Sequence, residues 1–131
     1  MKVLHYINFV LITIFLVVIC AVEDKVVSQS LYQIQSECFE IEKLVDEKNN
    51  LKNMDIVMEI ENLEYTWLED EESMCYLVNH KSIQEIGQEI AKLKLYISEN
   101  DIEAFKVSLS AIRGYCHSYL HFMGANFHNI L

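Results

Sequence analysis

Two histidines stand four residues apart near the end of the chain, a spacing that can hold a metal ion between successive helical turns. They are His117 and His121, and His128 and His80 are further candidate ligands. Because Ser118 follows His117, the general-base glutamate of the metalloprotease motif H-E-x-x-H is missing. No Asp or Glu lies nearby in the sequence to complete a ligand set, so we expect no metal site.

Cysteine and histidine also lie close together in the sequence, as in enzymes that use an activated thiolate. Cys116 and His117 are adjacent, but neighbouring side chains on a helix point about 100° apart, so these two cannot form a dyad. Cys75 and His80 diverge as well. The sequence has no G-x-S-x-G, P-loop or G-x-G-x-x-G motif. We therefore expect a protein that is not an enzyme and that needs no cofactor.

The first part of the chain has the pattern of a secretory signal. Lys2 supplies a positive charge, and Phe9–Ile19 is an apolar run of eleven residues whose most polar member is Thr13. This pattern predicts a signal peptide over residues 1–21, followed by one secreted, extracellular domain over residues 22–131.

An uncleaved membrane anchor is the alternative. The apolar segment can be extended to Val3–Val22, which is long enough to cross a bilayer, although His5 and Asn8 then fall inside it. The large side chain of Ile19 also spoils the small-residue pattern of a clean cleavage site.

Cleavage of a signal peptide would leave three cysteines in an oxidising compartment. In an antiparallel bundle Cys38 and Cys116 lie at the most similar heights, so we predict a disulfide between them. Cys75 is then a free or intermolecular thiol. The alternative is three reduced cysteines that pack in the core as small apolar side chains.

Four apolar stripes with helical spacing follow the signal-like segment. They comprise Val27, Leu31, Ile34, Cys38, Ile41 and Val45; then Ile56, Ile60, Leu63 and Trp67, widened by Met54 and Val57; then Ile83, Ile86, Ile90, Leu93 and Ile97; and finally Ile102, Phe105, Leu109, Ile112, Cys116, Tyr119 and Met123. Short connections make consecutive helices antiparallel, so the fold class is all-α, a small up-down-up-down four-helix bundle.

The helix ends are also predicted from local signals. Lys48–Asn50 is a polar break, Asn100 or Asp101 is the N-cap of the last helix, and Gly124 is its stop. We expect Met74–Val78 to belong to the third helix.

Acidic side chains outnumber basic ones by 20 to 10, which gives a net charge of −10 and excludes a nucleic-acid partner. Eight acids and no Lys or Arg lie between Asp55 and Glu72. We expect Asp55, Glu59, Glu61 and Glu64 to bind a partner protein of basic character. The alternative is that these charges serve only solubility.

The end of the last helix is aromatic and uncharged, with Tyr115, Tyr119 and Phe122 as a second candidate partner-binding surface. Such an apolar excess fits a partner helix, a homodimer face or a hydrophobic ligand, unless residues 125–131 fold back and cover it.

Three functions stay open at this point. The first is a secreted, non-enzymatic protein that binds a partner protein. The second is an extracellular carrier of a small hydrophobic ligand, and the third is a membrane-anchored helical domain that keeps its apolar segment. The membrane is a partner only in the third.

Overall fold

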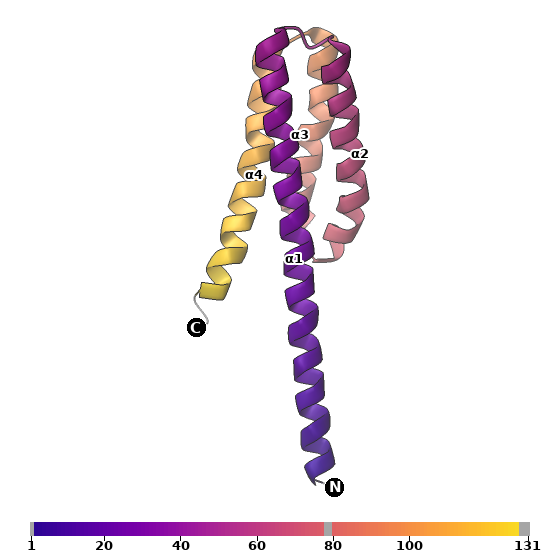
Figure 1. Ribbon diagram of the computed structural model, residues 1–131, viewed down its shortest axis with the longest axis vertical. Coiled ribbons are helices and arrows are strands. Elements are labelled where there is room, and N and C mark those ends of the chain that lie inside the picture. Colours follow the sequence, from indigo (N-terminus) through magenta and orange to yellow (C-terminus); the bar gives the residue numbers. More distant parts are fainter. Residues whose placement is uncertain (1, 78–79, 129–131) are drawn as a thin grey trace.

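The computed structural model describes residues 2–77 and 80–128, and the side chains of these residues except 2–4, 75–77, 80, 82 and 122–128. This part of the chain forms helices and no strand. The helices are α1 (Lys2–Lys48), α2 (Met54–Leu77), α3 (His80–Glu99) and α4 (Ile102–His128). Each helix runs antiparallel to the next, and α1 contacts α2 and α4 while α3 contacts the same two (Figure 1). The expected all-α bundle is confirmed.

The core is made of the predicted stripes. All six stripe residues of α1 and all four of α2 are buried, as are four in α3 and four in α4. Ile97, Ile102 and Tyr119, at the ends of their stripes, are partly buried and pack against the same cluster. Because every helix buries one face, no helix is stable without its neighbours.

Two predicted boundaries are wrong. Met74 is fully buried and belongs to α2, which runs on to Leu77, whereas Val78 lies outside the described residues. The acidic cluster before Met74 contains no glycine or proline, so nothing in it interrupts the helix. At the other end of the chain α4 continues through Gly124 to His128, since one glycine inside a helix costs only about 1 kcal/mol. Residues 125–128 therefore extend α4 and do not fold back.

The end of the bundle that holds the α1–α2 and α3–α4 loops is closed by two asparagines. Asn49 and Asn100 have φ angles of 48° and 55°, the left-handed conformation that ends a helix and that asparagine tolerates. The Asn100 Oδ1 atom accepts a hydrogen bond from the backbone N–H of the buried Leu51 at 3.0 Å. Asp101 then caps α4, as expected, by accepting from the N–H of Ala104 at 3.0 Å. One side chain thus ties the two loops together.

Polar side chains also join neighbouring helices along their length. Arg113 of α4 pairs with Glu42 of α1, and its carbonyl oxygen accepts a hydrogen bond from Gln35 Nε2 at 3.1 Å. Further ion pairs link α2 to α3 (Glu64 with Lys94) and α1 to α4 (Asp46 with Lys106). These contacts fix the relative heights of the helices.

Helices α2 and α3 approach each other closely at Gly87. A Cβ atom at this position would lie 3.0 Å from Nε1 of the buried Trp67. The indole therefore occupies the space that any larger residue at position 87 would need.

The first half of α1 lies outside the bundle. α1 is one uninterrupted helix of 47 residues, and its lower part projects well beyond the other helices (Figure 1). Residues 5–22 are exposed apart from the partly buried Ile19, and they are long and apolar enough to cross a membrane. Within this segment the Thr13 hydroxyl donates to the Phe9 carbonyl at 2.9 Å, so its polar group is satisfied by the helix itself. The apolar segment and the first core stripe thus belong to the same helix.

The tie at Asn100 gives a testable prediction. Asn100→Ala leaves the buried Leu51 amide without its acceptor and puts alanine in a left-handed conformation, so it should lower the free energy of unfolding by about 2 kcal/mol. The matched control is Asn49→Ala, which has the same backbone problem but removes no described side-chain hydrogen bond. Thermal unfolding of the full chain in a mild non-ionic detergent, followed by circular dichroism, measures both. Equal destabilisation by the two changes would contradict the proposed role of the Leu51 contact.

Candidate functional site

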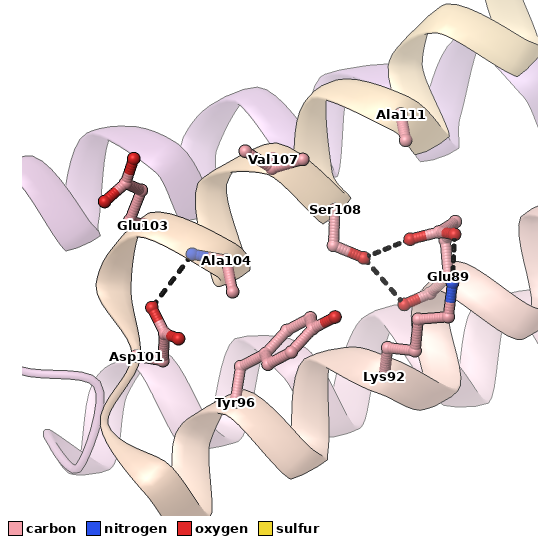
Figure 2. Close-up of a pocket in the computed structure, with 9 residues that line it drawn as sticks. All are labelled: Glu89, Lys92, Tyr96, Asp101, Glu103, Ala104, Val107, Ser108 and Ala111. Carbon is pink, nitrogen blue, oxygen red and sulfur yellow. Dashed lines mark hydrogen bonds and ion pairs between the residues drawn. The ribbon is translucent and has the colours of Figure 1, made fainter.

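A cleft of about 440 Å³ lies between α3 and α4, and it holds a connected group of polar side chains (Figure 2). Ser108 of α4 donates to Glu89 Oε2 at 2.6 Å, and Lys92 donates to the other carboxylate oxygen, also at 2.6 Å. The Ser108 hydroxyl also lies 3.2 Å from the Glu89 carbonyl oxygen. Figure 2 shows Tyr96 beside this group and Asp101 at the far end of the cleft, where it caps α4.

The geometry of this cleft fits a cross-link between helices better than a reaction centre. Ser108 is only 2% exposed, and its hydroxyl hydrogen is directed to Glu89. Burial of Glu89 opposes its ionisation, but the hydrogen bonds from Lys92 and Ser108 outweigh burial and lower the pKa of this carboxyl. The same contact with Glu89 raises the pKa of Lys92. The three side chains stabilise one another and join α3 to α4.

The four predicted acidic residues do not share one face of α2. Asp55 lies toward α1, where its carboxylate is 3.9 Å from Lys48 Nζ. Glu64 lies toward α3 and pairs with Lys94. Glu59 and Glu61 are exposed, and neither has an ion pair among the residues that the structure describes. Asp55 and Glu59 therefore lie on the α1 side of α2 and Glu64 lies on the α3 side, while Glu61 falls on the outward surface between them.

That surface is a second apolar stripe, which we call the outer stripe of α2: Met54, Met58, Tyr65 and Leu68. These four side chains are 70%, 55%, 64% and 60% exposed, and their spacings of 4, 7 and 3 residues keep them on one helical face. The prediction that Met54 widens the buried stripe is wrong, because its side chain is exposed. The spacing of four residues between Met54 and Met58 was the signal in the sequence for this exposure. It places the two methionines on the same face of the helix, which is the outward side and not the core side.

The aromatic end of α4 is divided between core and surface. Tyr119 packs against the core, and Tyr115 is 36% exposed. Burial, followed by the nearby Asp24 carboxylate on α1, raises the pKa of the Tyr119 hydroxyl. The side chain of Phe122 lies outside the described residues. His117 and His121 are both exposed, and no three His, Cys, Asp or Glu side chains converge within the part of the chain that is described.

The two cysteines of the predicted disulfide are both fully buried, in facing stripes of α1 and α4. They are present as free thiols. Burial raises the pKa of both, to about 12 for Cys116, and the neighbouring Cys116 contributes to the increase at Cys38. The bundle thus brings the two sulfur atoms near each other, while the bond itself stays a prediction. The side chain of Cys75 is outside the described residues.

Together these features define an all-α bundle whose first helix extends into an exposed apolar segment, and whose α2 carries an exposed apolar stripe with acidic residues on it and beside it. A protein-family model matches residues 22–130 of the chain, and its description is "domain of unknown function (DUF4363)". The chain belongs to this family. Comparison with curated proteins and with solved structures gave no significant match.

The cross-link in the α3–α4 cleft should make stability depend on pH. The pKa of Glu89 in the folded protein lies below its ordinary value of 4.5. The stabilisation of the folded state by its carboxylate is therefore fully present above about pH 4.5 and disappears as the pH falls through the folded pKa. Glu89→Gln should lower the free energy of unfolding by about 1 kcal/mol at pH 7. The difference from the unmodified protein should shrink toward zero near pH 3, measured by thermal unfolding in detergent. An equal difference in stability between the two proteins at pH 3 and at pH 7 would show that the ionised Glu89 carboxylate is not its source.

Proposed function

We propose that this protein is a membrane-tethered, non-enzymatic interaction protein, which keeps its apolar segment as an anchor and presents a helical bundle at the membrane surface. One observation carries the proposal. Residues 5–22 of α1 are apolar around the whole circumference of the helix, and none of the membrane-length apolar window is buried against the rest of the protein. A helix that is apolar on every side needs an apolar environment, and a bilayer supplies one.

The residues around the candidate cleavage points favour an anchor over a signal peptide. The large Ile19 is a poor match to the small-residue pattern of a cleavage site. In the uncleaved chain, residues 19–26 belong to an unbroken helix that continues into the core at Val27, so the anchor and the bundle are joined directly. His5 and Asn8 lie in the first two turns of the segment, near one membrane surface and away from the bilayer centre.

Both the anchor and the cleaved signal place the bundle on the same side of the membrane. A positive residue before the apolar segment and acidic residues after it are typical of segments that direct the following chain across. Lys2 and the pair Glu23 and Asp24 have this arrangement. The bundle would then face the exterior, where its acidic surface is available to other proteins.

The outer stripe of α2 is the best-supported binding surface. Monomeric proteins seldom expose a row of large apolar side chains on one helical face, and methionines adapt readily to different partner surfaces. Glu59 lies beside the stripe and Glu61 lies within it, in the gap between Met58 and Tyr65, and neither has an ion pair among the described residues. An amphipathic helix with an apolar face and basic edges would complement both features.

Two alternatives to a basic partner protein are less well supported, namely a second copy of the chain and a small hydrophobic ligand. Association of two copies through the outer stripe would bring the acidic flanks together, and the sequence between Asp55 and Glu72 has no Lys or Arg to compensate. A hydrophobic ligand would need an apolar cavity in the bundle. The surface clefts that we find are lined in part by charged side chains, such as Glu89 and Lys92 in one and Glu64 and Glu71 in another.

The anchor is tested by membrane retention of the full chain expressed in cells with a C-terminal tag. The product should stay in the membrane pellet after alkaline carbonate extraction, and its intact mass should include residues 1–21. Val17→Arg should reduce retention severalfold, because arginine at the centre of a spanning helix costs about 2.5–3.5 kcal/mol. Val107→Arg, an exposed position in the bundle, is the control and should have no effect. A soluble product that starts near residue 22 would instead support the secreted alternative.

The binding surface is tested by photocrosslinking in the cells that naturally make the protein. A photoreactive amino acid at Met58 should crosslink one discrete, basic protein, whereas the same group at Val107 on α4, which is no less exposed (66% against 55%), should not. Glu59→Gln combined with Glu61→Gln should reduce the crosslink severalfold, since the charge attraction is lost. Equal yields at positions 58 and 107 would mean that the outer stripe is not the site.

A further inference from the structure

The end of α4 reaches the level at which α1 leaves its apolar segment. Arg113 of α4 is bonded to both Gln35 and Glu42 of α1, which fixes the relative height of the two helices at this point. The helices are antiparallel and rise equally, about 1.5 Å per residue. The fifteen residues from Arg113 to His128 therefore bring the end of α4 to the height of roughly residues 20–27 of α1.

Helices α2 and α3 do not reach as far. Asp55 lies beside Lys48 at the closed end, and α2 ends at Leu77, which corresponds to the height of about residue 26 of α1, at the bundle-side edge of the range that the end of α4 reaches. Figure 1 shows the same order: the lower end of α4 lies below the lower ends of α2 and α3, and it leans away from α1. Of the three shorter helices, α4 comes nearest to the membrane surface implied by the anchor.

The composition of this end of α4 fits a membrane interface. The chain from Gly114 to Leu131 contains no Asp, Glu, Lys or Arg, although the whole protein carries thirty such residues. It contains tyrosine, phenylalanine and histidine instead, and aromatic rings are enriched where the hydrocarbon meets the head groups. The interfacial layer beyond the hydrocarbon is roughly 5–7 Å thick on each side, so a helix end at this height would lie within it.

We propose that the end of α4, residues 120–128, rests in the interfacial layer of the same leaflet from which α1 emerges, with phospholipid as its binding partner. The inference rests on the proposed anchor, because α1 sets the height of the membrane. Two contacts then hold the bundle at a fixed tilt, whereas a single helix would let it rotate. The outer stripe of α2 would face sideways along the membrane surface.

Depth-dependent quenching of a fluorescent label tests this contact in the full chain. Single cysteines are introduced by His128→Cys, Leu11→Cys and Glu103→Cys in a background with Cys20→Ala and Cys75→Ser. The buried thiols of Cys38 and Cys116 react too slowly to interfere. Each variant is labelled in detergent with an environment-sensitive dye and reconstituted into phosphatidylcholine vesicles that carry a nitroxide at a shallow or a deep acyl position. Phe127→Cys repeats the test one residue earlier in case the His128 variant does not fold.

The label at position 128 should be quenched at least twofold more than the label at position 103, and more by the shallow nitroxide than by the deep one. The label at position 11 should show the reverse depth order. Quenching at position 11 without quenching at 128 or 127 would overturn the α4 contact and leave the anchor intact. The same conclusion holds if a protein shields the label at position 128 or 127 from the lipid. No quenching at position 11 would overturn both.

Discussion

The arrangement of this protein depends on how one helix is shielded from water. Twelve large apolar side chains between Tyr6 and Val22 are exposed, and transfer of each to an apolar environment is worth about 1–2 kcal/mol when they start half-exposed. Their sum, on the order of 10–20 kcal/mol, is as large as the whole folding free energy of a typical domain. The same helix also supplies the first core stripe, from Val27 to Val45. Because both parts belong to α1, the bundle is joined to the exposed apolar segment by continuous helix.

The rest of the fold positions surfaces relative to that helix. Bonds between Arg113 and α1 set the height of α4, the Asn100 contact fixes the loops at the far end, and the Ser108–Glu89–Lys92 group joins α4 to α3. With these ties the outer stripe of α2 has one defined direction. A rigid platform of this kind suits the proposed role, in which the protein holds a binding surface at a set distance from a membrane.

The sequence predicts the core better than the surface. Stripes such as Ile56–Trp67 follow from spacing alone, because a helix with one buried face repeats its apolar residues every three or four positions. The same rule cannot assign Met54, since a second apolar stripe on the opposite face overlaps the first in the sequence. The predictions for Gly124 and Met74 are wrong because local signals compete with helix continuation, which tertiary packing decides. Contacts between distant residues, such as Asn100 with Leu51 and Arg113 with Gln35, leave no local pattern at all.

In the proposed anchored protein, α1 runs as one rigid helix from the anchor into the bundle, and hydrogen exchange across this junction tests that continuity most directly. The full chain in phospholipid nanodiscs is followed by mass spectrometry, with peptides covering residues 19–30. A continuous helix should protect the amides of residues 23–27 nearly as well as those of the core turn that follows, by at least a hundredfold relative to an unstructured chain. Exchange at the unstructured rate in residues 23–27, between protected segments on both sides, would show a flexible linker and contradict the account.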